Sequence, residues 1–509
     1  MERRLTAGAG LLTWIMLGLA LALLAGGLIL GAGQNGETRK ALALALVVLL
    51  VLWKGLPPLC RRLGRLGAVR AWLVLTLLCL AVKGAWVLLV RVTPSGDYAT
   101  FWGYANALAQ QPVLEGGRYM ALFPNIFGYA SFLSWFIRLL GPGELLAQGL
   151  NVLLTAASGG FLFLLGRQWW GLPAGISAYL LWIACPSQTI YNSLILSEPL
   201  YTALTLGVLV LLTAEEGKRP VVRGVAAGLA LRWCNGVRPI AAVVIIALVL
   251  WRVLLKPEEW LLEESRRYWL GLLDALLAVY ALTGPLWQAH LTRRIGEEPS
   301  TTPGYSILVG FNQNSGGAWN QEDSDLLFSL SNAPGATAQQ AQEGALEAAK
   351  ARITSGEVAL LPLMRDKLRA FLGSDHACMG YVNSVVRHTK LFALICNGFY
   401  YAALVVAGAG LVRLWQNRAR SAVVLLPLYG LGLTCAQMLV EVAGRYHYSL
   451  IPVLLLLGQA AFSRLSRQRQ KFFKKTGKAL DREWLLEYHN QAPVWGAVCD
   501  DAGDCSAMR

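Results

Sequence analysis

The stretch AWLVLTLLCLAVKGAWVLLVRVTPSGDY, residues 71–98, decides the fold class of this chain. The part before Arg91 is almost wholly apolar and long enough for a membrane-spanning helix, which needs about 20 apolar residues. A polar turn follows, and Asp97 is the first acidic residue after the apolar run. We therefore expect a helix that crosses a bilayer and leaves it just before Asp97.

The rest of the chain shares this apolar character, with 55% hydrophobic residues and a mean hydropathy of +0.48. Ordinary soluble domains are less apolar than this. Candidate spans lie at 11–30, 41–56, 71–90, 121–140, 146–165, 174–184, 194–212, 221–233, 240–255, 269–289, 391–411, 423–440 and 449–462. Runs 174–184 and 221–233 are short, and we expect 221–233 not to cross fully. The sequence predicts an all-α integral membrane protein with about 12 transmembrane helices.

The net charge of +15 does not indicate a nucleic-acid partner, because the basic residues gather between and after the apolar runs. They cluster at 54–70, at 413–420 and at 464–478, which is the pattern of cytoplasmic loops. These basic flanks also suit anionic membrane lipids. Arg3 and Arg4 allow a cleaved signal peptide, but the apolar run after them is too long for one. We expect both termini in the cytoplasm and Asp97 on the outer face of the cell membrane.

The chain divides into five parts by this topology. Residues 1–70 form two extra N-terminal spans and a basic cytoplasmic loop, and residues 71–289 form the core membrane module with a first outer loop at 91–120. Residues 290–390 form a large extracytoplasmic loop domain, residues 391–463 the C-terminal spans, and residues 464–509 a basic cytoplasmic tail with one helix near 481–489. We expect outer helices at 98–110, 337–353 and 357–372. A long ordered loop is either a lid over a site or a stabilising cap.

Four residues around the first outer loop are candidates for a site. Asp97 is either a general base or a solvated charge at a helix end, and the aromatic loop that begins with Tyr98 favours the first. Lys83 lies inside the span before it, where a cation either faces a polar interior, and could meet a phosphate, or snorkels to the surface. Arg118 precedes the return into the membrane and is either a ligand for substrate or an interface anchor.

A second group comes from later in the chain. Glu198 opens an apolar span, in which Ser197 and Pro199 could instead form an ordinary helix start. Arg238 follows a Gly-containing break between two apolar runs, and such breaks tend to line cavities. Arg445, Tyr446 and His447 form a dense polar cluster on the outer side, where an anionic substrate would suit the arginine; an ion pair between Arg445 and Glu441 is the plainer alternative.

These motifs resemble the multispanning GT-C glycosyltransferases, specifically bacterial relatives of the protein O-mannosyltransferases and aminoarabinose transferases. The elements that carry the resemblance, over roughly 71–462, are Ser95-Gly96-Asp97-Tyr98, Tyr119-Met120-Ala121-Leu122-Phe123-Pro124, Leu196-Ser197-Glu198-Pro199-Leu200, Gly236-Val237-Arg238-Pro239, the large late outer loop and Gly444-Arg445-Tyr446. Their order and spacing are more specific than any one of them.

The resemblance implies a GT-C-type bundle that transfers a sugar from a polyprenyl-phosphate carrier to an acceptor hydroxyl on the outer face, with inversion. Asp97 would take the proton of the acceptor, while Arg445 and Arg238 would hold the leaving phosphate. Glu198 would orient the sugar or a second polar group. The acceptor is a protein, a lipid or a wall polymer.

Two positions depart from the family pattern. Many relatives carry a second acid where this chain has Tyr98, and a proline pair where it has Phe123-Pro124. A single aspartate is a poor divalent site, so we expect no required cofactor; a divalent metal is allowed but not indicated. A transporter or flippase of lipid-linked sugars is the alternative function, and a membrane scaffold is a third. The concentration of polar residues on one face favours the enzyme.

Overall fold

A computed structural model of the protein describes residues 2–214 and 219–462, and within these residues every regular element is helical. Seven helical segments are long and apolar enough to cross a membrane: α1 (Glu2–Ala32), α2 (Gly36–Gly64), α3 (Ala68–Leu89), α7 (Glu144–Trp170), α13 (Glu263–Ile295), α19 (Thr389–Gln416), and η3 (Ala422–Val424) with α20 (Leu425–Leu439). Four shorter apolar segments accompany them: α8 (Leu172–Ala184), α10 (Glu198–Thr213), α12 (Ala241–Val249) with η1 (Leu250–Leu255), and α21 (Leu450–Phe462). The prediction of an all-α membrane protein is confirmed.

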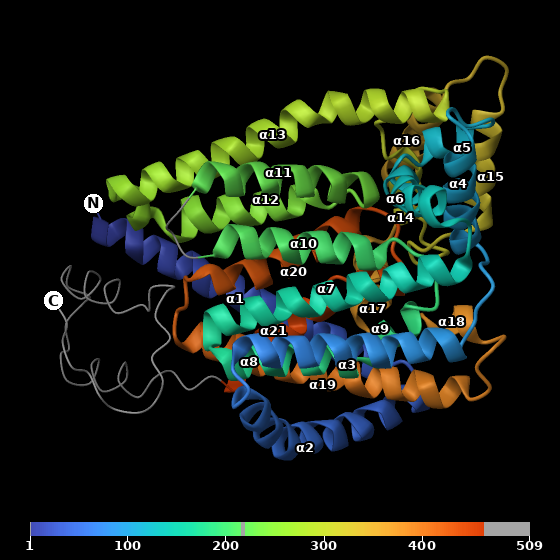
Figure 1. Ribbon diagram of the computed structural model, residues 1–509. Coiled ribbons are helices and arrows are strands. Elements are labelled where there is room, and N and C mark those ends of the chain that lie inside the picture. The colour runs from blue at the N-terminus through green and yellow to red at the C-terminus, as the bar shows by residue number, and fades with distance from the viewer. Residues whose placement is uncertain (1, 215–218, 463–509) are drawn as a thin grey trace, which may run out of the picture. The chain divides into compact units, whose positions relative to one another are not determined.

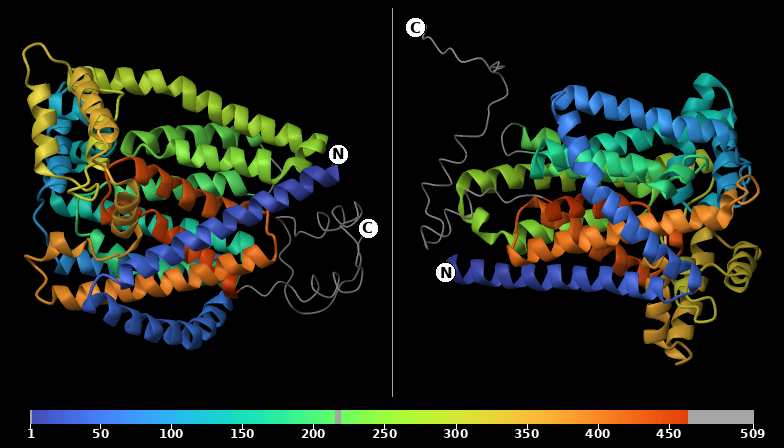
Figure 2. Two further views of the ribbon diagram at one scale, coloured as in Figure 1. Left: turned by 180° about the vertical axis from the view of Figure 1, so that it is seen from behind. Right: turned by 90° about the horizontal axis from the view of Figure 1, so that it is seen from below.

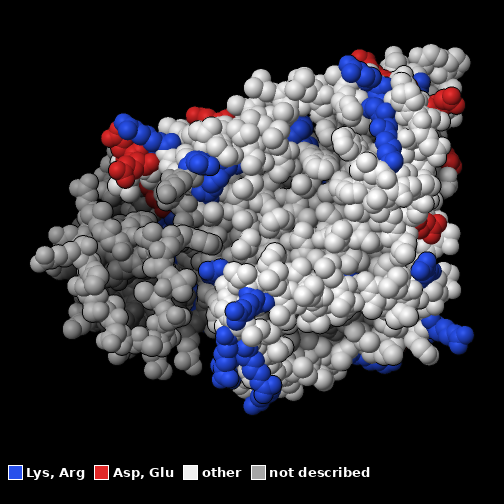
Figure 3. Space-filling model, viewed as in Figure 1, with Lys and Arg blue, Asp and Glu red and all other residues white. Residues whose placement is uncertain are grey.

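The surface of these helices suits a lipid environment. Large apolar side chains are exposed along α2, among them Leu46, Val47, Leu50, Val51 and Trp53. Figure 3 shows charged side chains gathered mostly toward the two ends of the helices, with a broad uncharged surface between them. Because water would penalise so much exposed apolar area, this band indicates the part of the protein that faces lipid.

The short helices gather at one end of the bundle, which we call the α4 end (Figures 1 and 2). They are α4 (Asp97–Gln110), α5 (Arg118–Leu122), α6 (Asn125–Leu140), α9 (Pro186–Tyr191), α14 (Gly304–Gly310), α15 (Gln321–Ser331), α16 (Ala338–Thr354), α17 (Leu360–Leu372) and α18 (Met379–Val382). The helices expected at 98–110 and 337–353 are therefore present. The third begins at Leu360 rather than at 357, because Ala359 before it is extended.

One expected span differs in the structure, and a second run stays as expected. The run 121–140 is broken at Phe123 and Pro124 into α5 and α6, and α6 packs against α4 at the α4 end. The run 221–233 belongs to α11 (Pro220–Val237), which lies along α10 and α13. It is not among the described helices that are long and apolar enough to cross a membrane, so the expectation that 221–233 does not cross fully stays a prediction. The short run 174–184 is α8, and Pro186 restarts the chain as α9, as a broken span requires.

Glycines bring α6, α11 and α13 into close contact. A Cβ on Gly128 would lie 2.2 Å from the carbonyl oxygen of Gly236, and a Cβ on Gly236 would lie 2.2 Å from the ring of Trp287. Only a residue without a side chain fits at such a backbone approach. This contact fixes the end of α11 immediately before Arg238.

Lys367 joins the α4 end to the neighbouring span. Its ammonium is fully buried and donates hydrogen bonds to the carbonyl oxygens of Gly310, Met438 and Val440 at 2.8, 2.9 and 2.7 Å. Burial lowers its pKa to about 8, so the group is still mostly charged at neutral pH. Its three donors match the three acceptors. The contact ties α17 to the end of α14 and to the chain just after α20.

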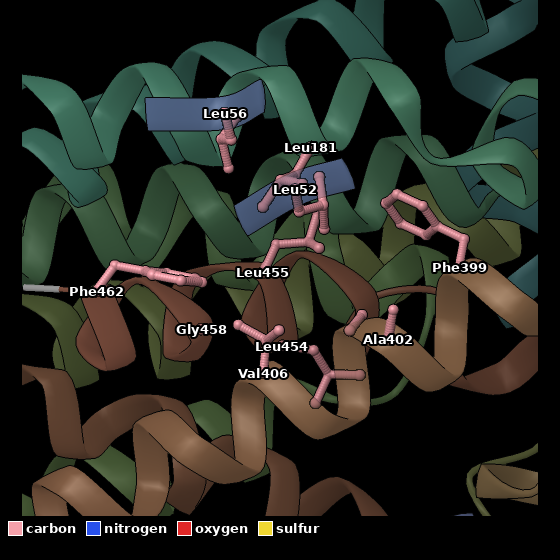
Figure 4. A pocket seen from close by; sticks show the side chains of 11 residues that line it. Leu52, Leu56, Leu181, Phe399, Ala402, Val406, Leu454, Leu455, Gly458 and Phe462 are labelled. Carbon is pink, nitrogen blue, oxygen red and sulfur yellow. The ribbon is translucent and has the colours of Figure 1, made fainter. Parts of the chain in front are cut away.

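A small apolar cavity lies between α2, α8, α19 and α21 (Figure 4). It is lined by Leu52, Leu56, Leu181, Phe399, Ala402, Ala403, Val406, Leu454, Leu455, Gly458 and Phe462. None of the residues predicted for a site lines this cavity. The helix near residues 481–489 and the basic run 464–478 lie outside the described residues.

Candidate active site

Asp97 stands at the start of α4, where the chain turns after α3. Gly96, with φ +54°, makes the turn, and Asp97 is the first residue of the helix. A carboxylate in the first turn is favoured by the helix dipole. Its side chain is 52% exposed at the surface of the bundle, and its carboxylate reaches Arg445.

Glu198 opens α10 but is buried, with only 3% of its side chain exposed. Pro199 lies in the first turn as expected. Ser197 does not cap the helix; its hydroxyl instead donates to Glu198 Oε2 at 3.4 Å. A buried carboxylate is costly unless it is paired, and two arginines supply its partners.

Arg238 is one of them. The chain is extended at this residue, with φ −147° and ψ 131°, between the end of α11 and the start of α12. This is the expected break in a span. The guanidinium Nη2 lies 3.4 Å from Glu198 Oε1, and the guanidinium carbon lies 4.3 Å from the centre of the Tyr446 ring. Charge and ring stacking therefore fix its position.

Arg445 is the other partner. It lies in η4 (Gly444–His447), a single turn of 3₁₀ helix between α20 and α21. Its Nη2 forms an ion pair with Asp97 Oδ2, its Nε lies 3.7 Å from Glu198 Oε1, and its Nη1 donates to the hydroxyl of Tyr381 at 3.1 Å. The guanidinium also lies 5.5 Å from the ring centre of Tyr446.

The structure thus brings Asp97, Glu198, Arg238 and Arg445 together from four distant parts of the chain. We call these four residues the charge cluster. Two guanidiniums face two carboxylates, so the charges balance. Glu198 lies inside and contacts both arginines, whereas Asp97 reaches Arg445 from the exposed side.

Tyr446 and Glu441 border the charge cluster. The Tyr446 hydroxyl donates to Glu441 Oε1 at 3.0 Å. Burial raises the pKa of Glu441 above its ordinary value, although Tyr446, Arg445 and Arg238 oppose the rise. The plainer alternative, in which Arg445 pairs with Glu441, is not the arrangement found, since the ion pairs of Arg445 are with Asp97 and Glu198.

His447 does not face a ligand and instead anchors the η4 turn. It is buried, with Nδ1 2.6 Å from the carbonyl oxygen of Phe371 and Nε2 3.1 Å from Asp375 Oδ1. Ser187 donates to the other oxygen of Asp375 at 2.5 Å. Both ring nitrogens are therefore occupied by protein atoms, and the prediction that His447 binds substrate is wrong.

Two other predicted residues, Tyr98 and Arg118, contact other parts of the protein. Tyr98 is buried beneath Arg445 and packs edge-on against Tyr381, so it supports the arginine. Burial raises its pKa well above the ordinary value, which keeps the phenol neutral. Arg118 forms an ion pair with Glu297 at 2.6 Å and donates to the carbonyl oxygen of Ala336, which links α5 to the segments around α14 and α16.

Lys83 does not lie where the prediction of a substrate contact requires it. It is fully buried within α3, and its ammonium donates to the carbonyl oxygens of Ile183 and Cys185 and to the hydroxyl of Thr189. It neither snorkels nor meets a phosphate, because it is sealed and its donors are used. The carbonyls it satisfies are those left free where α8 breaks.

Tyr381, Asp375 and Ser187 are the polar residues that sequence reasoning missed. They lie in the segment 373–388 and in α9, and nothing in their spacing connects them to residues 445–447. Among the described residues, no group of three or more His, Cys, Asp or Glu side chains is placed to hold a metal ion. Metal independence stays a prediction.

The arrangement supplies the parts for chemistry on a phosphate ester. The two guanidiniums can hold an oxyanion through several N–H donors, and an exposed carboxylate stands beside them to accept a proton. These groups come from α4, from α10, from the break between α11 and α12 and from η4, so the site depends on the packing of these segments.

The solved structures that are similar to this chain include two crystal structures of one protein. The crystal structure of ArnT from Cupriavidus metallidurans bound to undecaprenyl phosphate has 11% sequence identity and a TM-score of 0.29, over 81% of each chain. The apo structure of the same protein has 14% identity and a TM-score of 0.28, over 78% of each chain. Because both TM-scores are low, neither match supports a functional assignment. No family model and no curated protein matches the sequence.

Proposed function

We propose that this protein is a membrane glycosyltransferase, which moves a sugar from a polyprenyl-phosphate donor to an acceptor hydroxyl on the outer face of the membrane with inversion. The observation that carries the proposal is the charge cluster at the α4 end. It places two arginines beside one exposed carboxylate, in the motifs that resemble the GT-C glycosyltransferases.

In this proposal Arg445 and Arg238 hold the phosphate of the donor. Glu198 lies beneath both guanidiniums and is almost fully buried, so it positions them and has little surface for a sugar. Asp97 accepts the proton of the acceptor hydroxyl. The acceptor oxygen then bonds to the anomeric carbon as the carbon–oxygen bond to phosphate breaks, and the electron pair leaves with the phosphate.

The test measures transfer by the purified full-length protein with a panel of polyprenyl-phosphate sugars and acceptors, and detects released polyprenyl phosphate. We expect Asp97→Asn to lower the rate by about 10²–10⁴-fold, the usual contribution of a general base. Asp325→Asn, an exposed acid in α15, serves as the control and should keep full activity. If Asp97→Asn also keeps full activity, Asp97 is not the base.

A donor-binding measurement separates the roles of the arginines. Arg445→Ala should weaken binding of the donor, because a guanidinium contact to phosphate is lost. Unchanged binding would contradict the phosphate role. The panel itself identifies the sugar and distinguishes a protein, lipid or wall-polymer acceptor.

A further inference from the structure

The two acids of the charge cluster are placed differently. Glu198 is 3% exposed and contacts both guanidiniums, so its charge is a fixed part of the interior. Asp97 is 52% exposed, and its one ion pair among the described residues is with the outer side of Arg445. Two positive groups therefore share one sealed counterion, and the remaining positive charge is balanced by a residue at the surface.

Arg445 is the fixed partner of this outer ion pair. Tyr381 accepts a hydrogen bond from its Nη1, Glu198 lies against its Nε, and the rings of Tyr98 and Tyr446 lie 5.9 and 5.5 Å from its guanidinium carbon. Asp97 instead follows a turn at Gly96, in the first turn of a helix. If the pair separates, Asp97 is the partner able to move.

We propose, on the basis of the proposed function, that Asp97 occupies the position of the donor phosphate while the donor is absent. Carboxylate and phosphate oxygens present the same kind of acceptor to a guanidinium. The donor phosphate displaces Asp97 from Arg445, and the released carboxylate turns to the acceptor hydroxyl. The donor therefore binds before the acceptor, and the base is freed only when a donor is present to react.

This exchange makes an unusual prediction for donor binding. Removing the charge of a catalytic base normally leaves the binding of a phosphate that it does not contact unchanged. Here the removal of the Asp97 charge frees Arg445, for which Asp97 and the donor phosphate compete. An ion pair with one half-exposed partner is worth up to about 1 kcal/mol, which corresponds to about fivefold in affinity. Asp97→Asn should thus bind the carrier about fivefold more tightly than the natural protein, although it does not transfer sugar.

The experiment measures binding of undecaprenyl phosphate in detergent micelles to the full-length protein, to Asp97→Asn, to Arg445→Ala and to the double variant. Asp325→Asn controls for the loss of an acidic charge elsewhere at the surface. The gain from Asp97→Asn should disappear in the Arg445→Ala background, since the contact that Asp97 blocks no longer exists there. Asp97→Ser repeats the measurement with a second side chain that cannot pair.

Three results would contradict the inference or its premise. Equal or weaker binding by Asp97→Asn and Asp97→Ser would show that Asp97 does not compete with phosphate. A gain that persists without Arg445 would show a general charge effect rather than an exchange. Failure of the folded natural protein to bind undecaprenyl phosphate would instead overturn the proposed function.

Discussion

Replacing Glu198 by glutamine tests the architecture of the charge cluster most directly. The substitution keeps the shape of the side chain but leaves Arg238 and Arg445 without their shared buried counterion. At separations of 3.4 and 3.7 Å and an effective dielectric constant of about 20, each attraction is about 4–5 kcal/mol before desolvation is considered. Removing one partner of a buried pair costs about 3–5 kcal/mol, because the other charge stays buried.

We expect the low end of that range, about 3 kcal/mol, for two reasons. The arginine side chains are 13% and 20% exposed, so water screens them in part, and the new amide oxygen can still accept one hydrogen bond. Thermal unfolding of the purified protein, followed by tryptophan fluorescence at one scan rate, should show a Tm lower by about 3 °C, because a chain of this length unfolds with an entropy of about 1 kcal/mol/K. Glu347→Gln, at an exposed ion pair in α16, should leave the Tm unchanged.

The same variant should respond to anions. With Glu198 neutral, the cluster holds two positive charges against Asp97 alone, so an added phosphate binds more strongly. A ligand present at 100 times its Kd stabilises a fold by about 2.7 kcal/mol, which would restore most of the loss. The natural protein should gain less from the same phosphate. A variant as stable as the natural protein, or one indifferent to phosphate, would refute the reasoning that Glu198 is the buried counterion.

Two further predictions concern the border of the cluster and the packing beneath it. Since burial raises the pKa of Glu441, the folded state holds a proton that the unfolded state releases, and stability falls as pH rises above about 4.5. Glu441→Gln should remove this dependence of Tm on pH, and a dependence that persists would assign it to another group. Gly236→Ala should lower the free energy of unfolding by about 1–3 kcal/mol, because the new Cβ meets the ring of Trp287, and should weaken donor binding by displacing Arg238. In the control Gly149→Ala, in α7, the new Cβ meets no atom within 4 Å, so the Tm should stay the same or rise. Equal melting temperatures for the two alanine variants would contradict the close contact.

The fold class could be predicted from the sequence because apolar runs of membrane length are a strong local signal. The error in the predicted spans came from a segment whose local composition misleads. The run 121–140 is apolar, yet Phe123 and Pro124 break it and α6 packs against α4 instead of continuing as a span.

The charge cluster was predictable in part, since charged residues at the ends of apolar runs are rare and costly. Asp97, Glu198, Arg238 and Arg445 all carried that signal. Lys83 carried it too, but its partners are backbone carbonyls freed by the break after α8, and a sequence does not show where free carbonyls lie. For the same reason the contacts of His447 with Asp375 and Phe371 could not be foreseen, because they depend on how distant segments fold together.

The buried ammonium of Lys367 also constrains the order in which the protein can be assembled during synthesis. Its first acceptor, Gly310, is translated before it, but Met438 and Val440 emerge from the ribosome later. Until α20 has been inserted, Lys367 is a charge with two of its three acceptors missing. A nascent chain truncated before residue 438 therefore leaves the α4 end unfinished, and insertion of α20 becomes the step that completes the contacts of the α4 end.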